Sequence, residues 1–172
     1  MTRYAAFLRG VNVGGVTLKM SAVAKALEDA GFGDVTTVLA SGNVLLTSAA
    51  GAAGVRTKAE KALRDEFGYE AWVLVYDVDT LADISAGYPF EREVDGHHSY
   101  ITFVSDDDVL RELAALEAGP GEVIAAGEGV LYWQVPRAST LDSAIGKTMG
   151  KKRYKSSTTT RNLRTIDKLL RR

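Results

Sequence analysis

Eight polar and glycine residues near the start of the chain could together bind an anion. Glycine lets backbone N–H groups approach a ligand closely, arginine grips a phosphate or carboxylate with two hydrogen bonds, and asparagine adds amide donors. A helix that follows such a loop would add its positive end. The residues of this predicted site are Arg9, Asn12, Gly14, Gly15, Lys19, Ser41, Gly42 and Asn43. The alternative interpretation is that the glycines only permit tight turns and the polar groups satisfy one another.

A second candidate is the basic C-terminal part of the chain. Residues 137–172 hold 11 Lys and Arg against 2 Asp, whereas residues 1–136 hold 10 Lys and Arg against 20 Asp and Glu. This asymmetry indicates an anionic partner, or a basic tail that docks on the acidic body of the same protein. A nucleic acid would be contacted through Lys147, Lys151, Lys152, Arg153 and Lys155. Arg161 and Asn162 join the predicted ligand-binding residues, with a purely structural role as the alternative.

Little in the sequence predicts catalysis. The chain has no cysteine, which excludes disulfides, thiolate metal sites and a cysteine nucleophile. The two histidines, His97 and His98, are neighbours in a predicted polar connection, where an extended backbone would point them to opposite sides. We therefore expect neither a metal site nor a cofactor. No nucleophile with its base is recognisable, and the catalytic residues stay unknown.

The pattern of apolar residues predicts the elements that position these candidates. Short apolar runs indicate strands, and repeats of three and four residues indicate amphipathic helices, in the order β-α-β-β-α-β. The first set comprises strands at 4–8, 35–40, 44–47 and 71–76 and helices at 20–30 and 55–67. The second set comprises strands at 100–104, 123–126, 130–135 and 153–157 and helices that begin at Ser105 and at Asp142 or Ser143. Thr159 or Thr160 would then cap a final helix.

This order predicts an α+β protein of two ferredoxin-like (α/β plait) units. Each unit would have an antiparallel sheet with helices packed on one face, and a basic C-terminal helix would complete the second. The predicted division is a first unit at 1–76, a linker with a short helix at 77–97 and a second unit at 98–172. In this topology the first loop and the central hairpin turn emerge at one end of the sheet. Residues 10–15 and 41–43 should therefore be neighbours.

RNA-recognition modules share this fold and stack bases on aromatic residues of their first and third strands. The first half has no aromatic residue on its third strand. The second half offers Tyr100, Phe103, Tyr132 and Trp133. Because adjacent residues of a strand face opposite sides, either Tyr132 or Trp133 is expected in the core. RNA binding of this kind is therefore an alternative for the second half alone.

Four ordered segments resemble the signature of a known family. They are Arg9–Gly15, Ser41–Val44, Pro89–Phe90 and Thr159–Asn162, and together the chain resembles the domain of unknown function 1697 family. The resemblance implies the tandem α/β plait and implies no activity, because none is established for the family. The chain has Leu163 where the family usually has an aromatic residue after Arg161–Asn162.

The function predicted from these features is non-enzymatic binding of an anionic ligand, either a phosphorylated small molecule or a nucleic acid. The alternative is an enzyme that acts on a phosphorylated or carboxylated metabolite and anchors it at the Arg9–Lys19 loop. The first residues lack the apolar run of a signal peptide, and no segment has the length of a membrane span. We therefore expect a cytoplasmic protein.

Overall fold

The computed structural model describes most of the chain in two compact units, Met1–Leu81 and Ala82–Arg172. The described residues are 1–9, 12–13, 16–38, 42–68, 71–92, 94–137, 148, 154 and 157–171, with the backbone alone at 12–13 and 16–17. Several sequence predictions fall outside these ranges, namely those on Gly14, Gly15, Ser41, Lys147, Lys151, Lys152, Arg153, Lys155 and the helix expected from Asp142 or Ser143. The second unit includes most of the segment predicted as a linker.

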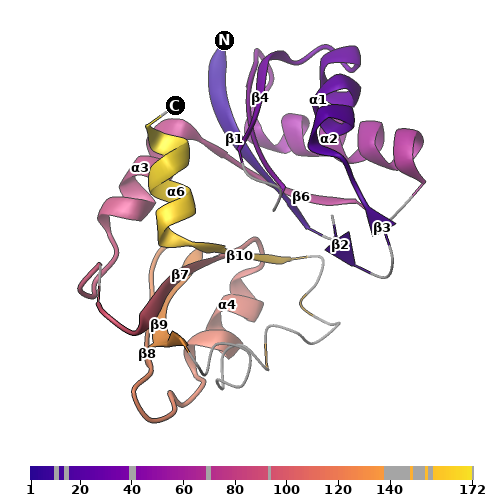
Figure 1. Cartoon of the computed structure of the whole chain (residues 1–172). Coiled ribbons are helices and arrows are strands. Elements are labelled where there is room, and N and C mark those ends of the chain that lie inside the picture. The colour runs from indigo at the N-terminus through magenta and orange to yellow at the C-terminus, as the bar shows by residue number, and fades with distance from the viewer. Residues whose placement is uncertain are drawn as a thin grey trace. The chain divides into compact units, whose positions relative to one another are not determined.

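The first unit is built on a four-stranded antiparallel sheet with the strand order β4-β5-β1-β6 (Figure 1). The strands are β1 (Thr2–Arg9), β4 (Gly33–Val38), β5 (Asn43–Ser48) and β6 (Trp72–Asp77). Strand β1 is central because it is apolar on both faces, and Tyr4 to Leu8 are all buried. Its register pairs Phe7 with Asn43 on one side and with Leu74 on the other.

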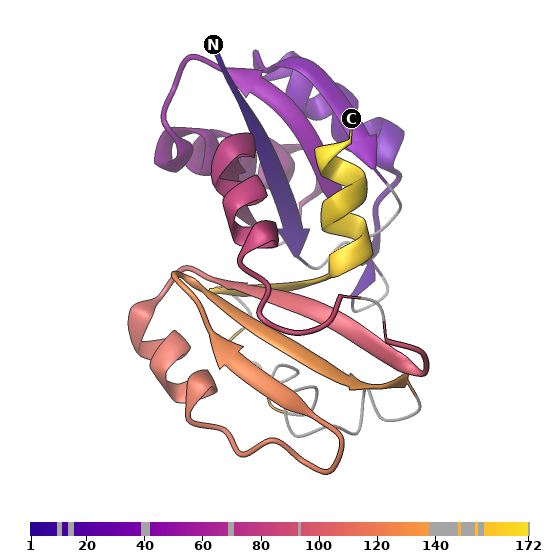
Figure 2. The same cartoon turned by 90° about the vertical axis from the view of Figure 1, so that its left-hand side faces the viewer.

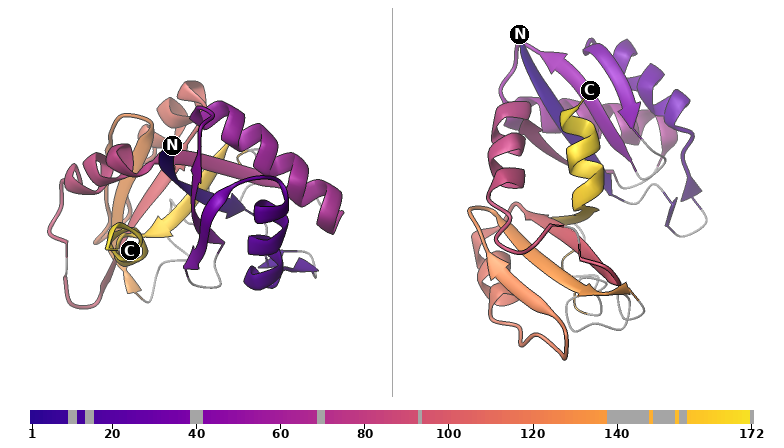
Figure 3. Two further views of the ribbon diagram at one scale, coloured as in Figure 1. Left: turned by 90° about the horizontal axis from the view of Figure 1, so that it is seen from above. Right: turned by 60° about the vertical axis from the view of Figure 1, so that its left-hand side comes forward.

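Two helices cover one face of this sheet, α1 (Met20–Asp29) and α2 (Ala52–Phe67) (Figures 1 and 3). Their apolar stripes, which include Val23, Leu27, Val55, Ala59 and Leu63, pack against alternate residues of the sheet strands. Helix α2 ends at Gly68, whose φ of 66° is the left-handed conformation that glycine adopts without steric cost. Both predicted helices of the first half are confirmed within a few residues.

The segment predicted as a glycine-rich loop contains a small β-ribbon. Strands β2 (Asn12–Val13) and β3 (Val16–Thr17) pair antiparallel, Asn12 with Thr17 and Val13 with Val16. The prediction of a loop at residues 10–15 is therefore wrong for Asn12 and Val13. β-Branched residues favour an extended backbone and account for the pairing.

The second unit has its own four-stranded antiparallel sheet, with the order β10-β7-β9-β8 (Figure 2). Its strands are β7 (His97–Val104), β8 (Val123–Ala126), β9 (Val130–Pro136) and β10 (Thr158–Asn162). The unit also contains α4 (Asp107–Ala114) and α6 (Leu163–Leu170), and the boundary between the units falls within α3 (Val78–Ala86). The described part of the chain thus forms an α+β protein with two four-stranded antiparallel sheets and five helices.

One face of the second sheet is packed against α4. Leu113 of α4 is fully buried among Val104, Leu131, Trp133 and Val135. Asp106 caps the helix, because its Oδ1 accepts hydrogen bonds from the backbone N–H groups of Asp108 (2.8 Å) and Val109 (3.3 Å). The sequence prediction that Ser105 is the cap was wrong by one residue, and a carboxylate suits this position because it also faces the positive helix end.

The C-terminal elements differ from the prediction. The expected strand at 153–157 lies mostly outside the described residues. The caps at Thr159 or Thr160 are wrong, because Thr158–Asn162 is strand β10 and pairs with β7 along its whole length. The true cap of α6 is Asn162, whose Oδ1 accepts from the backbone N–H of Arg164 at 2.9 Å. Threonines are good caps but better strand residues, and here the strand pairing prevails.

None of the described helices has the length and apolar character needed to cross a membrane.

Candidate functional site

The predicted anion site is described in part, and that part lies at one end of the first sheet. The backbone N–H of Leu8 donates to the carbonyl oxygen of Gly42 at 2.8 Å, so the last residues of β1 lie beside the turn between β4 and β5. Gly42 has a φ of 86°, a conformation that favours glycine. We call the described residues Arg9, Gly42 and Asn43 the sheet rim.

Arg9 is the unusual member of the sheet rim. Its Nε is buried and has no hydrogen-bond partner among the described residues, and burial lowers the pKa of its guanidinium. A buried donor without an acceptor is destabilising, and an anion that reached it would offset that cost.

The other predicted residues of the first unit have structural roles or point to solvent. Asn43 is fully buried, and its Nδ2 donates to the carbonyl oxygen of Val38 at 3.0 Å, across the turn. Lys19 precedes α1, where its carbonyl accepts from the N–H groups of Ala22 and Val23, and its side chain is exposed. Asn12 is described by its backbone alone, in β2. For Asn43, the structure agrees with the interpretation that polar groups at the turn satisfy one another.

Arg161 and Asn162 both serve the local structure, and only one of them lines a pocket. The buried guanidinium of Arg161 donates from Nη1 to Thr159 Oγ1 at 2.6 Å and to the carbonyl oxygen of Thr160 at 3.0 Å. These bonds hold the backbone of β10 rather than reach outward. Asn162 caps α6 and also lines a pocket that the sequence did not predict.

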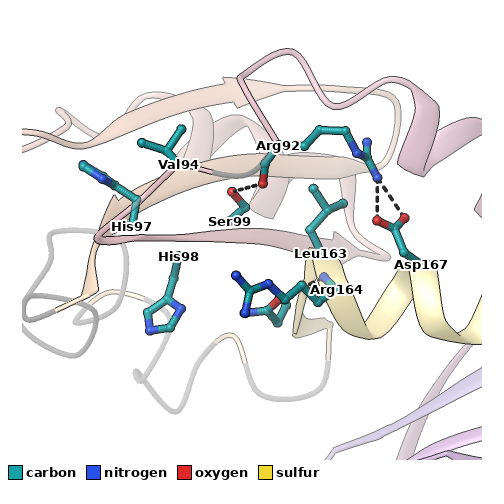
Figure 4. A pocket seen from close by; sticks show the side chains of 9 residues that line it. Arg92, Val94, His97, His98, Ser99, Leu163, Arg164 and Asp167 are labelled. Atoms are coloured by element: carbon teal, nitrogen blue, oxygen red, sulfur yellow. Dashed lines mark hydrogen bonds and ion pairs between the residues drawn. The ribbon is translucent and has the colours of Figure 1, made fainter.

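This pocket of about 180 Å³ lies where strand β7 begins and helix α6 starts (Figure 4). The pairing of Asn162 with Tyr100 brings the start of α6 next to His98 and Ser99, although more than sixty residues separate the two segments in sequence. We call it the β7–α6 pocket; its walls are Arg92, Val94, His97–Ser99, Asn162–Arg164 and Asp167.

An ion pair closes one side of the pocket. Nη2 of Arg92 donates to both carboxylate oxygens of Asp167, at 2.8 and 2.9 Å. Ser85 of α3 donates to Asp167 Oδ1 at 2.9 Å, and its own carbonyl accepts from Arg92 Nη1 at 2.8 Å. The negative charge of Asp167 is therefore compensated, and the network fixes the orientation of α6 relative to the segment before β7.

The opposite side of the pocket is positively charged. The guanidinium of Arg164 extends from the first turn of α6 toward the ring of His98 (Figure 4), and it makes no hydrogen bond or ion pair with any described residue. Partial burial lowers the pKa of His98, and the nearby charges of Arg137 and Arg164 lower it further. The ring of His98 also lies 5.7 Å from that of Tyr100. The guanidinium of Arg164 thus has no compensating carboxylate among the described residues.

The lowered pKa of His98 predicts a dependence of stability on pH. The unfolded chain binds a proton at His98 near pH 6.5, whereas the folded protein does so only at lower pH, so stability should fall as the pH drops below about 7. His98→Asn should lose less stability than the wild-type protein between about pH 7 and pH 5, and Arg164→Gln should show part of this reduction. The midpoint of urea unfolding at each of the two pH values measures the loss of stability. An equal loss in all three proteins would contradict the prediction.

Two predictions about the second half are corrected by these positions. His97 and His98 are the first residues of β7, not part of an exposed connection, because Gly96 turns the chain with a φ of 77° and pairing with β9 then begins. Phe103, Tyr132 and Trp133 are all buried, so these three rings cannot serve as the base-stacking platform of an RNA-recognition module.

The comparisons with known proteins agree with the resemblance seen in the sequence. The conserved bacterial protein SP0830 from Streptococcus pneumoniae has a similar solved structure, with a TM-score of 0.81 and 24% identity over 99% of this chain and 97% of that chain. At this identity the likeness shows the fold alone. No curated protein matches the chain significantly. The model of DUF1697, a protein family of unknown function, matches residues 1–132, which include three of the four signature segments. The chain therefore belongs to the DUF1697 family.

Proposed function

We propose that both units have the ferredoxin-like topology. Numbered in chain order within each unit, the four strands have the spatial order 2-3-1-4 in the first sheet and 4-1-3-2 in the second, which is the same order read from the other edge. A helix joins the first two strands in both units, and α2 joins the last two strands of the first. These features support a tandem repeat of one unit.

We propose that the protein is a binding protein for a small anionic ligand and that the β7–α6 pocket holds it. The observation that carries this proposal is the guanidinium of Arg164, which faces His98 across the pocket without a partner among the described residues. The positive charge of Arg164 disfavours protonation of the partly buried His98, and no carboxylate among the described residues compensates it. An anion would compensate this charge and accept charge-assisted hydrogen bonds from the guanidinium.

The acidic side chain among the described walls of the pocket, Asp167, does not neutralise Arg164. The side chain of Asp167 could neutralise Arg164 from the same helix, but it is held by Arg92 and Ser85. The first turn of α6 contains no acidic residue that could take the place of a ligand. The positive charge of Arg164 therefore stays available to an anionic ligand.

The sheet rim is a second candidate site for the same function. The specific observation in its favour is the buried Nε of Arg9, which has no hydrogen-bond partner among the described residues. A phosphate or carboxylate at this end of the first sheet would supply the missing acceptor.

Ligand-induced stabilisation separates the two sites. A true ligand at a hundredfold excess over its dissociation constant should stabilise the protein by about 2.7 kcal/mol. With acetate and phosphate as probes at constant ionic strength, Arg164→Gln should abolish the effect, whereas Arg171→Gln at the other end of α6 should retain it. Loss of stabilisation in Arg9→Gln instead would assign the function to the sheet rim. No stabilisation of the wild-type protein by either anion would reject the proposal.

A further inference from the structure

We infer that the ligand of the β7–α6 pocket is a compact carboxylate with a short apolar tail. This inference rests on the proposed function, because it names the chemical class of the anion. Three properties of the described walls lead to it: the size of the pocket, its net charge and its apolar side.

The pocket is too small to enclose a large ligand completely. Cavities of roughly 150 Å³ accept a benzene ring, and drug-sized ligands need about 300–1,000 Å³. A pocket of about 180 Å³ therefore encloses a group only slightly larger than a benzene ring. A nucleotide exceeds this size several times, whereas a carboxylate with a few carbon atoms fits.

The charge of the walls matches a monoanion. Among the described lining residues, Arg92 and Arg164 contribute two positive charges and Asp167 one negative charge, which leaves one positive charge when the histidines are neutral. A carboxylate brings one negative charge. A phosphate monoester brings about 1.5 to 2 at pH 7, more than these walls compensate.

The apolar part of the wall indicates a tail. Leu163 and Val94 line the pocket, Leu163 between Arg164 and the Arg92–Asp167 ion pair and Val94 beside His97 (Figure 4). A short anion such as acetate would leave water against Val94, which is only partly buried, whereas Leu163 is already 2% exposed. Methylene groups of a ligand would displace that water, and each buried CH₂ group contributes about 0.8 kcal/mol, roughly a fourfold gain in affinity.

The same walls disfavour amino acids. The ammonium group of an amino acid needs an acceptor with negative charge, and both oxygens of Asp167 already accept from Arg92. Beside the positive charge of Arg164, an added ammonium group would be repelled. We therefore expect a simple carboxylic acid to bind more tightly than its α-amino derivative.

Calorimetric titrations of the full chain with a matched series of probes test this inference. The probes are acetate, butyrate, butyramide, 2-aminobutyrate and inorganic phosphate, at one pH and one ionic strength. Butyrate should bind roughly fifteenfold more tightly than acetate, because two more CH₂ groups are buried. Butyramide and 2-aminobutyrate should bind at least tenfold more weakly than butyrate. Val94→Thr, which keeps the shape of valine, should reduce the ratio between butyrate and acetate, and Arg171→Gln should leave it unchanged.

The outcomes separate this inference from the function on which it rests. Equal affinities for acetate and butyrate, or tighter binding of phosphate than of butyrate, would overturn the ligand class while the anion-binding function stands. Absence of binding by all three anions would overturn both. If the ratio of the affinities for butyrate and acetate is unchanged in Val94→Thr, the apolar tail of the ligand does not lie against Val94.

Discussion

Arg164→Glu is expected to weaken the binding of a small carboxylate by at least about tenfold, because it removes hydrogen bonds to a charged group that contribute about 1.5–3 kcal/mol and adds a repulsive charge. The fold should not suffer from the same change. Position 164 lies in the first turn of α6, where a negative charge suits the positive helix end, four residues before Lys168. We expect stability to stay equal or to rise by about 0.3–1 kcal/mol. Calorimetric titration and urea unfolding measure the two effects.

Arg171→Glu is the matched control for this charge reversal. Arg171 is at the C-terminal end of the same helix, outside the pocket, where a negative charge faces the negative helix end. This variant should lose a small amount of stability and keep its affinity, the opposite of Arg164→Glu. If both variants lost affinity to the same extent, the effect would come from the overall charge of the protein, and the pocket assignment would be wrong.

Leu113→Ala is expected to destabilise the second unit by about 2–5 kcal/mol, the cost of truncating a fully buried leucine. Leu113 connects α4 to the sheet through Leu131, Trp133 and Val135, so the cavity would open between α4 and β9. Each unit has one tryptophan, Trp72 in the first and Trp133 in the second. In a Trp72→Phe background, the fluorescence of the buried Trp133 therefore reports the unfolding of the second unit during urea titration.

Leu110→Ala serves as the comparison for the core truncation. Leu110 lies on the same helix and packs against the same cluster, but it is only partly buried. Its truncation should cost clearly less than that of Leu113, because less apolar surface returns to water. A loss below about 1 kcal/mol for Leu113→Ala would show that α4 is not part of the cooperative core.

Much of the fold could be predicted from the sequence because the core elements have strong periodic patterns. The stripe of α2, with Val55, Ala59 and Leu63, has one interpretation only, and Gly68 marks its end. The predictions are wrong where one run of residues favours two different local structures. The run Thr158–Thr160 favours both a strand and a helix cap, and only pairing with β7 decides that it is a strand. The cap then moves to Asn162.

The β7–α6 pocket could not be predicted because no local pattern marks it. Its walls come from segments on both sides of β8 and β9, and they meet only through the register that pairs Asn162 with Tyr100. His98 had been interpreted as part of a polar connection, because the first residues of a strand at the edge of a pocket are as hydrophilic as a loop. Asn162 was among the predicted ligand residues, yet its side chain caps α6.

The pKa of His98, followed by NMR through its imidazole C–H signals, is the most direct test of anion binding in this pocket; His98→Asn identifies the signals. In the free protein the pKa should lie below its ordinary value of 6.5. Saturation with butyrate should raise the pKa, because the carboxylate compensates Arg164 and Arg137 and stabilises the protonated ring. If butyrate binds by calorimetry and the pKa of His98 does not change, the anion binds elsewhere on the protein and the central claim is wrong.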